Sequence, residues 1–405
     1  MSESTESNKS ASKRRRRWFM PLIVVVVVLC VLALAVLNAL QPGNLAELRA
    51  EWEAAGGVDD LSKLMPEPIP DEENAAVIYR RILPEVAVAT RTQEFNRTLD
   101  ESPHDLDALN ALLAPHEELL TELLEAAMME QGHWGEDHYA SPPDSMAMTM
   151  GWQMQMRDAA RLMYADLLRQ LARGDLEAAE QRFHATMNMA SHAMQPTTIL
   201  NVLVSLAIRT TALEALKESL QDQPRMIADS SWLDRPAPDE LTRQMVLHEG
   251  AHSLPMIAAA TGGAMRVLQG RNEAAYLDLM LQAYRQAETP FWQQDWSGAQ
   301  IESSVFLTVA DSVAPAINRA VEAIWLMEGR FLQLETAFEL RRYHAEHGSY
   351  PETWETPTNP VTGQPIEYER TETGFRLRLQ RQRAGDEPGG QDTPPENSDL
   401  ILEWR

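Results

Sequence analysis

The sequence contains a single cysteine, Cys30, and it lies inside a long apolar run near the N-terminus. The chain beyond that run therefore has no disulfide, no thiolate metal ligand and no cysteine nucleophile. A phosphate-binding glycine loop is also missing, and no pattern marks one serine as the nucleophile of a Ser/His/Asp triad. Several common enzyme classes are excluded by these absences alone.

Lysine is scarce as well, with four residues among 35 basic ones against 60 acidic residues. The formal net charge is −25, and because the first 17 residues contribute +4, residues 18–405 carry −29. A polyanion is repelled by the phosphate backbone of nucleic acids and by anionic membrane surfaces. We therefore expect no nucleic-acid partner.

The longest apolar run extends from Trp18 to Leu40 and directly follows the basic stretch Lys13 to Arg17. At about 1.5 Å per residue, a helix of this length crosses a hydrocarbon core about 30 Å thick. The sequence therefore predicts an N-terminal transmembrane helix over residues 18–40, through which the protein sits in a membrane.

Two other interpretations of this run remain open. A cleaved signal peptide has a shorter apolar part, of about 7–15 residues, and ends at a small-x-small site. Here Ala33-x-Ala35 lies too deep in the run to be a good site. A lipoprotein would use Cys30, but Leu29 occupies the position where a small residue is required. We therefore favour an uncleaved anchor.

The charges around the anchor predict its orientation. Residues 1–17 hold six basic and two acidic residues, so they are expected to stay in the cytoplasm. The bulk of the chain is then extracytoplasmic, and we expect a single-pass protein of the bacterial inner membrane with a periplasmic body.

Beyond the anchor the pattern is mainly helical. Residues 44–55 form an amphipathic segment, and Pro115 is expected to split a leucine-rich helix over residues 104–130. Residues 146–172 and 175–194 flank the helix-breaking Arg173-Gly174-Asp175, which resembles one tetratricopeptide hairpin. No repeat of about 34 residues follows, so the sequence predicts one hairpin and not an array. Further helices are expected over residues 197–220, 236–254 and 264–288, with a last long helix over 314–347.

The C-terminal tail changes from a helical period to strand alternation. Tyr368 to Arg370, Phe375 to Gln380 and Leu400 to Trp404 read as strands, and Thr373-Gly374 as a turn. We predict a three-stranded antiparallel sheet packed on the end of the long helix.

The expected fold class is therefore mainly α: a transmembrane helix, an irregular helical bundle with hairpins, and a small α+β tail. The regions are a cytoplasmic tail (1–17), the anchor (18–40), a stalk and linker (41–70), a helical extracytoplasmic domain (71–313) and the long helix with the sheet (314–405).

The tail also carries a resemblance to the C-terminal part of type II secretion pseudopilins. There a long helix is followed by a Tyr-Pro pair, a proline- and glycine-containing turn and a small sheet. The matching positions here are Tyr350, Pro351, Asn359, Pro360, Gly363, Pro365 and Tyr368. Similar tails occur on large membrane-anchored helical bacterial proteins whose N-terminal part resembles Glu72 to Tyr79. That wider family implies no known activity, and the anchor here lacks the prepilin cleavage pattern, so we do not infer pilus assembly.

The sharpest chemical motif is the H-E-x-x-H stretch His248-Glu249-Gly250-Ala251-His252. On a helix, the two histidines share one face and can hold zinc, and Glu249 would be the general base for a zinc-bound water. Glu273 follows at the position of the third ligand in gluzincin peptidases, which this stretch resembles. The motif therefore offers a zinc-dependent peptidase as one function.

Three features count against that function. Gly250 weakens a helix at its centre, and Pro255 is expected to end or kink it one turn later. Residues 150–245 contain no strand pattern, whereas the peptidases that it resembles place a sheet edge beside the motif. Our preferred interpretation is that the histidines continue a stripe with Leu241 and Met245, with no catalytic residue, metal or cofactor.

A second group of candidate ligands lies around residues 133–156. Imidazole and thioether groups suit copper(I), and they are supplied by His133, His138, Met146, Met148, Met150, Met154 and Met156. The loop residues His133, Glu136, Asp137 and His138 could alternatively hold a divalent ion. Because methionine commonly fills irregular helical cores, we prefer a packing role for the methionines and a polar loop at residues 131–145.

Together these features favour a non-enzymatic interaction or scaffolding module, tethered to the inner membrane and binding a protein partner. The zinc-dependent peptidase at His248, Glu249, His252 and Glu273 is the alternative.

The orientation is directly testable. A reporter that is active only outside the cytoplasm, fused after Arg405, should be active, because the basic N-terminus stays inside. Replacing Arg14 to Arg17 with neutral residues should reduce correct insertion. An inactive C-terminal reporter on the intact chain would contradict the predicted topology.

Overall fold

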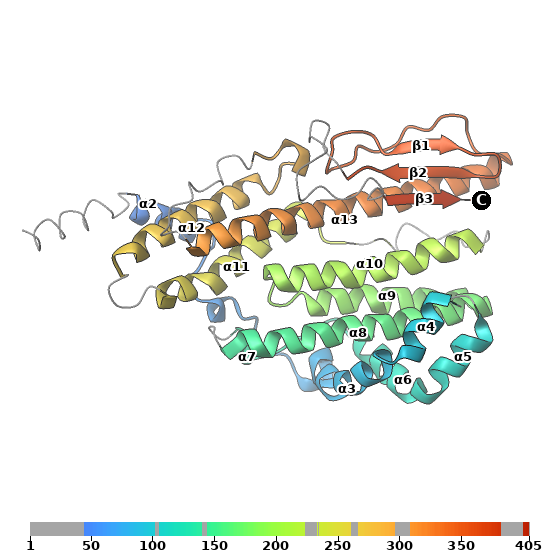
Figure 1. Cartoon of the computed structure of the whole chain (residues 1–405), viewed down its shortest axis with the longest axis horizontal. Helices are drawn as coiled ribbons and strands as arrows, with labels where there is room; N and C mark the ends of the chain where they lie inside the picture. The colour runs from blue at the N-terminus through green and yellow to red at the C-terminus, as the bar shows by residue number, and fades with distance from the viewer. Residues whose placement is uncertain are drawn as a thin grey trace, which may run out of the picture.

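The computed structural model describes residues 44–101, 105–139, 144–222, 233, 235–260, 266–295, 308–381 and 400–404. This part is mainly helical with one small antiparallel sheet, as the sequence predicts (Figure 1). The expected anchor at residues 18–40 lies outside the described residues. Within them, the segment Ile199–Lys217 is long and apolar enough to span a membrane, but 67% of it is buried in the fold. We therefore assign that segment to the protein core.

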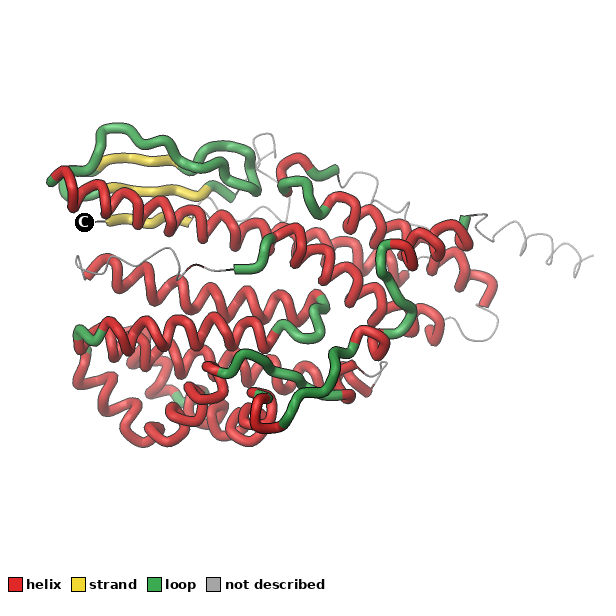
Figure 2. Tube along the Cα trace, turned by 180° about the vertical axis from the view of Figure 1, so that it is seen from behind, coloured by secondary structure: helices red, strands yellow, loops and turns green. Residues whose placement is uncertain are grey.

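The helices form three layers (Figures 1 and 2). The first layer holds short helices: α3 (Ala75–Thr90), α4 (Gln93–Glu101), α5 (Leu106–Leu113), α6 (Glu117–Met128) and α7 (Glu136–Tyr139). The expected break at Pro115 is confirmed, because a 3-10 turn, Ala114–His116, separates α5 from α6. The helix α3 begins at Ala75, where Asn74 caps it by accepting from Ala76 N–H.

The middle layer consists of α8 (Asp144–Arg173), α9 (Leu176–Ala193) and α10 (Ile199–Asp222). The predicted hairpin between α8 and α9 is confirmed. Gly174 has a φ of +73°, which favours glycine, and the Asp175 carboxylate accepts from Ala178 N–H at 3.1 Å to cap α9.

The third layer contains α11 (Pro238–Ala260), α12 (Arg266–Gln286), α13 (Thr308–His347) and the short α2 (Leu45–Ala54). We expected residues 41–70 to form a stalk and linker, but α2 packs on α12 with Leu48 and Trp52 buried. The segment after it crosses to the first layer, and its 3-10 turn Leu61–Leu64 contacts both α7 and α11. Apolar burial thus places this region inside the folded body.

Two apolar cores hold the layers together, and the middle layer contributes to both. Met156, Met163 and Ala190 face the first layer, whereas Leu168 and Phe183 face the third. The second core also includes α2, α13 and the sheet. The expected divisions at residues 70 and 313 therefore do not separate one core from another.

The sheet confirms the predicted strands. β1 (Glu367–Arg370), β2 (Phe375–Leu379) and β3 (Leu400–Trp404) are antiparallel in the order β1-β2-β3. Alternate residues of β2 are buried, and Gln333 of α13 donates to Leu377 O at 2.9 Å. The sheet therefore packs on the end of the long helix, as expected.

Asn359 organises the turn before the sheet. Its side chain accepts from Val361 N–H at 2.9 Å and donates to Gln380 O at 2.7 Å. Gly363 follows with a φ of +76°. The conformation of this turn thus gives a physical reason for Asn359-Pro360 and Gly363. The resemblance to pseudopilins stays a prediction.

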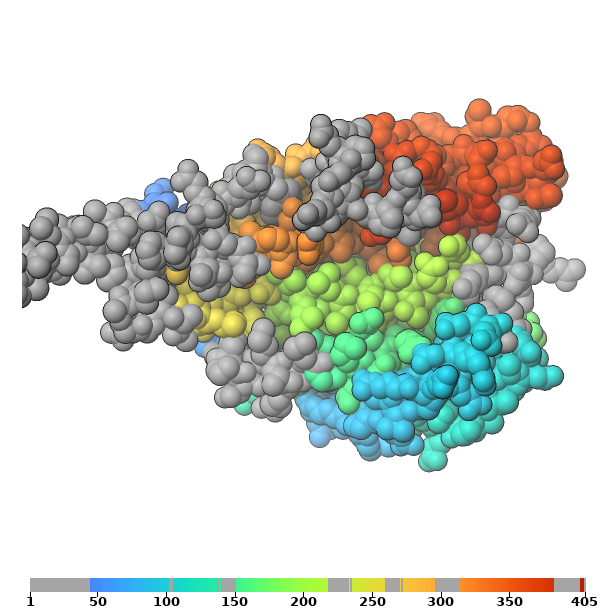
Figure 3. Space-filling model, viewed as in Figure 1, coloured from blue at the N-terminus to red at the C-terminus, as the bar shows by residue number. Residues whose placement is uncertain are grey.

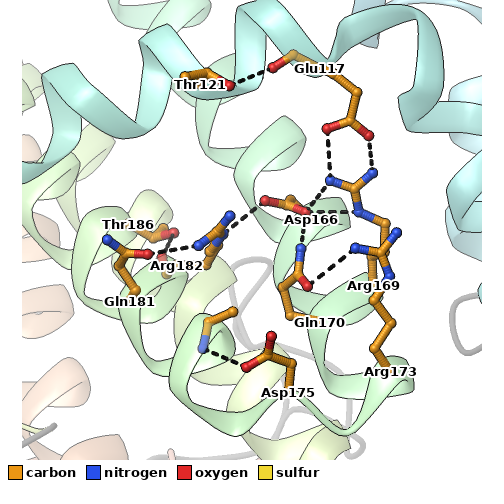
Figure 4. Close-up of polar contacts among 11 residues, drawn as sticks. Glu117, Thr121, Asp166, Arg169, Gln170, Arg173, Asp175, Gln181, Arg182 and Thr186 are labelled. Carbon is orange, nitrogen blue, oxygen red and sulfur yellow. Dashed lines mark hydrogen bonds and ion pairs between the residues drawn. The ribbon is translucent and has the colours of Figure 1, made fainter.

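A buried ionic cluster joins the first layer to the middle one (Figure 4). The Asp166 side chain, 3% exposed, pairs with Arg169 at 2.6 Å and with Arg182 at 2.9 Å. It also accepts from Gln170 at 2.8 Å, and Arg169 reaches on to Glu117 of α6. Each buried charge thus has an opposite charge or a hydrogen-bond donor beside it, which offsets the cost of desolvation.

Removing the central carboxylate should be costly. We expect Asp166→Ala to lower the free energy of unfolding by about 3 kcal/mol, because Arg182 then loses its carboxylate inside the fold. Urea denaturation measures this difference. Glu352→Gln, which removes the largely exposed partner of Arg370, is the matched control and should cost less than about 1 kcal/mol. Equal effects of the two changes would contradict the assignment.

Candidate functional site

The H-E-x-x-H motif lies on α11 and faces the N-terminus of α10. His248 Nδ1 accepts a hydrogen bond from Thr197 N–H at 2.8 Å. Glu249 Oε2 accepts from Ile199 N–H at 3.0 Å, and Ile199 is the first residue of α10. The first N–H groups of a helix have no partner within the helix and lie at its positive end. The two motif residues therefore satisfy backbone donors and supply a negative charge where the helix dipole favours one.

Further contacts hold Glu249 in place. Its second oxygen, Oε1, accepts from the Ser253 hydroxyl at 2.9 Å, one turn along α11. Its backbone carbonyl accepts from the Tyr276 hydroxyl of α12 at 3.2 Å. Both carboxylate oxygens are thus engaged, and the arrangement ties α10, α11 and α12 together at one point.

The two middle residues of the motif have packing roles. A Cβ on Gly250 would lie 2.4 Å from the Trp52 ring, and one on Gly57 would lie 2.1 Å from it. The indole is therefore sandwiched between two glycines, and its Nε1–H donates to Val58 O at 3.1 Å. Ala251 is buried against Leu61. Gly250, which would weaken an isolated helix, is therefore the residue that allows α2 to approach α11.

The expected third ligand is engaged elsewhere. Glu273 forms a two-pronged ion pair with Arg49 of α2, with N–O distances of 2.6 and 2.7 Å. His252 has a buried Nδ1 with no hydrogen-bond partner among the described residues. No group of three His, Cys, Asp or Glu side chains in the described part of the chain is arranged to hold a metal ion.

Pro255 does not end α11. Pro255 was expected to end or kink the helix, and the expected end is wrong, because the helix continues to Ala260. The helix packs on both α12 and α13, and buried residues such as Ile257 lie beyond the proline. Packing thus offsets the hydrogen bond that the proline removes.

The histidine-containing loop is not the polar loop that the sequence suggests. His133, Trp134 and Tyr139 are buried, and residues Glu136–Tyr139 form α7. The reason is Asn74, which accepts from His133 N–H at 2.8 Å and donates to His133 O at 3.0 Å. This paired contact draws the loop onto α3.

The other proposed ligands of this region do not gather in the described structure. Met156 is buried in a core, as preferred, whereas Met154 is an exposed side chain. Met146, Met148 and Met150 lie in the first turns of α8, and their side chains, like that of Asp137, are outside the described residues.

An aromatic cluster that sequence reasoning missed lies beside this loop. Trp134 stacks on Trp152 with ring centroids 4.1 Å apart and on Tyr79 at 5.9 Å. Its Nε1–H donates to His192 O at 2.8 Å, and the Tyr79 hydroxyl lies 3.1 Å from His192 Nδ1. Burial lowers the pKa of His192 to about 4. These residues are far apart in sequence, so only the tryptophan count hinted at such a cluster.

Comparisons of the chain with protein-family models, with curated proteins and with solved structures found no match.

Gly250→Ala tests the contact with Trp52. The new methyl group would overlap the indole, so we expect a loss of about 1–3 kcal/mol in the free energy of unfolding. Gly151→Ala in α8 is the matched control, because its Cβ would meet nothing within 4 Å among the described residues. The control should be neutral or stabilising by up to about 1 kcal/mol. Thermal melting distinguishes the two, and a neutral Gly250→Ala would contradict the packing.

The largely buried His248 leads us to expect a pH dependence of stability. Burial lowers its pKa to about 4, below the unfolded value of about 6.5. The unfolded chain therefore binds the proton first, so this contribution is complete above pH 6.5 and is lost as the pH falls toward 4. Each unit of the shift corresponds to about 1.4 kcal/mol.

His248→Asn should flatten this dependence, because the amide oxygen can accept from Thr197 N–H but does not titrate. Urea unfolding between pH 7 and pH 4.5 measures the slope. His184→Asn, at a side chain that is 38% exposed, is the control variant. If the free energy of unfolding of His248→Asn falls with pH as steeply as that of the wild-type protein, the assignment of this pH dependence to His248 is contradicted.

Proposed function

We propose that this protein is a membrane-tethered extracytoplasmic scaffold that binds a protein partner through helical surfaces and performs no catalysis. Residues 18–40 would hold it in the bacterial inner membrane, with residues 1–17 in the cytoplasm and the folded body in the periplasm. The proposal gives the apolar run, the charge asymmetry and the helical body one common role.

The observation that carries the proposal is the use of the H-E-x-x-H side chains in the fold. His248 and Glu249 accept backbone hydrogen bonds at the start of α10, and Glu273 is paired with Arg49. A zinc peptidase needs the Glu249 carboxylate beside a metal-bound water, and it needs His248, His252 and Glu273 as metal ligands. The described contacts instead support a structural role for the motif.

The shape of the folded body supports a scaffold that extends away from the membrane. The helix α13 has 40 residues and at about 1.5 Å per residue extends about 60 Å. It runs from the end of the molecule that holds α2 to the opposite end, where the sheet lies (Figure 1). Residues 41–44 can span at most about 15 Å, so α2 would lie close to the membrane and the sheet far from it.

The surface of the middle layer supports a binding role. Three large apolar side chains of the middle layer are exposed: Met154 of α8, and Leu200 and Leu203 of α10. Single exposed apolar residues are normal on proteins, whereas exposed apolar side chains that gather on one surface are typical of protein-binding sites. This is the surface that we assign to a partner.

Two substitutions at one position separate scaffold from peptidase. Glu249→Gln keeps an oxygen that can accept from Ile199 N–H, whereas Glu249→Ala removes the cap. If the protein is a scaffold, we expect Glu249→Gln to have near-normal stability and Glu249→Ala to lose about 1–2 kcal/mol in the free energy of unfolding. A zinc peptidase predicts that both lose activity alike, because neither has a general base.

Metal analysis of the purified full-length protein completes the test. The scaffold predicts no stoichiometric zinc and no shift of melting with chelators. About one zinc per chain that disappears in His248→Ala, with a peptidase activity that Glu249→Gln abolishes, would establish the alternative function. A photoreactive residue at Leu203 should then crosslink a partner in membranes, and one at the exposed Glu352 is the control for random contacts.

A further inference from the structure

The hairpin formed by α11 and α12 ends on the side of the molecule where α2 begins, away from the sheet (Figures 1 and 2). The space-filling view shows α2, in blue, and α11, in yellow, at this end, with the sheet, in red, at the other (Figure 3). Residues 261–265, which join α11 to α12, lie outside the described residues. If residues 18–40 hold the protein in a membrane, as proposed above, this end of the body faces that membrane.

Contacts with α2 show how far the hairpin projects. Helix α11 passes α2 at Gly250 and continues for ten more residues, to Ala260. Helix α12 pairs with α2 through Glu273 and begins seven residues earlier, at Arg266. At about 1.5 Å per residue, the two helices extend about 10–15 Å beyond these contacts. Residues 41–44 span at most about 15 Å, so the hairpin end lies within reach of the membrane surface.

The sequence of the hairpin end carries no negative charge. Residues 250–272 contain no aspartate or glutamate and two arginines, Arg266 and Arg271, so their formal charge is +2, whereas residues 18–405 together carry −29. Both arginines belong to the first two turns of α12. An anionic membrane surface, which repels the body as a whole, therefore attracts this end.

The neighbouring helix α2 is less suited to lipid contact, because it carries Glu47 in its first turn and Glu51 one turn later. Glu51 is paired with Arg285 of α12, and Glu273 of α12 is paired with Arg49 of α2. These ion pairs limit the repulsion between the two acids and a membrane. The hairpin end is thus the part of this region with the most favourable charge for a lipid surface.

The end of α11 is apolar and incompletely covered. Leu254, Pro255 and Met256 are only partly buried, and Ala258 is exposed. Residues 181–213 also lack acids, but most of them are buried in α9 and α10, so burial accounts for their composition. Burial does not account for the composition at the end of α11. Apolar side chains that enter the headgroup region of a bilayer leave water, which favours membrane binding.

We propose that the end of the α11–α12 hairpin rests on the anionic surface of the membrane that holds the anchor. The apolar end of α11 would lie among the lipid headgroups, and the positive charge of residues 250–272 would be attracted to lipid phosphates. This inference rests on the membrane tether proposed above. The anchor keeps the hairpin end at a high local concentration beside the membrane, so weak contacts are sufficient. Two contacts with the membrane would then set the angle at which the body extends from it.

Quenching of a fluorescent label by brominated lipids measures the contact. The sample is the full-length protein in nanodiscs of equal parts phosphatidylcholine and phosphatidylglycerol. The single cysteine, Cys30, lies in the predicted anchor, so a label on it reports the tether itself. On a Cys30→Ser background, Ala258→Cys places a label on the hairpin end, and Glu352→Cys places one beside the sheet, where Glu352 pairs with Arg370. We expect brominated lipids to quench the labels at residues 30 and 258 and to leave the label at residue 352 bright.

Removal of charge tests the role of the arginines. The double variant Arg266→Gln with Arg271→Gln should lower the quenching at residue 258 about twofold, because attraction to anionic lipids is lost. The double variant Arg342→Gln with Arg370→Gln removes the same charge beside the sheet and is the matched control, so it should change nothing. Nanodiscs of phosphatidylcholine alone should lower the quenching of the otherwise unaltered hairpin in the same way.

Three results would overturn the inference. The first is a label at residue 258 that stays bright while the label on Cys30 is quenched, which would leave the tether itself supported. The second is equal quenching at residues 258 and 352, and the third is quenching at residue 258 that removal of the two hairpin arginines does not alter. A label on Cys30 that stays bright would contradict the tether and this inference together, so the failures of the two proposals are distinguishable.

Discussion

The start of α10 is the constraint on which the rest of the structure depends. This helix lies between the two apolar cores, with Ile208 in one and Leu206 in the other. A helix start buried among its neighbours leaves N–H groups that water cannot satisfy, and each such group costs about 1–3 kcal/mol. Glu249 and His248 supply the missing acceptors from α11. The position of α11 against the middle layer therefore follows from a backbone requirement as well as from apolar burial.

The same turn of α11 also determines where α2 packs. The Trp52 ring lies against Gly250, and one residue later Ala251 is buried under the 3-10 turn Leu61–Leu64. Four consecutive residues of the motif thus contact three different segments. The five-residue pattern matches a zinc-binding signature, but in this fold it is a junction of three contacts. Glu249 caps α10, Gly250 allows Trp52 to approach closely, and the methyl group of Ala251 is packed against Leu61. The spacing of two histidines shows that they share a helix face, but it does not show what that face meets.

The sequence was informative wherever the cause of a structure is local. Pro115, Gly174 and the alternation of Phe375, Leu377 and Leu379 each determine backbone conformation or facing within a few residues, and the corresponding break, hairpin and strand are confirmed. It failed where the cause lies far along the chain. The burial of the His133 loop depends on Asn74, and the packing of α2 depends on Gly250, so neither could be deduced from the nearby residues.

At the H-E-x-x-H site, too, the local features could be predicted from the sequence and the long-range contacts could not. The helix that carries the H-E-x-x-H stretch was predictable from its period, and doubt about its metal chemistry could be argued from the lack of strands. The partners of Glu249 and Glu273 could not be predicted, because Ile199 and Arg49 lie 50 and 224 residues away.

The central claim is that Glu249 serves the fold by holding the first turn of α10. Amide hydrogen exchange over residues 195–206, compared between the wild-type protein and Glu249→Ala, tests it most directly. The account predicts faster exchange at Thr197 and Ile199 in the variant, with exchange in the sheet unchanged and no response to added zinc in either protein. Unchanged exchange at these two amides, together with a zinc-dependent slowing of exchange around His248 and His252 in the wild type, would contradict it.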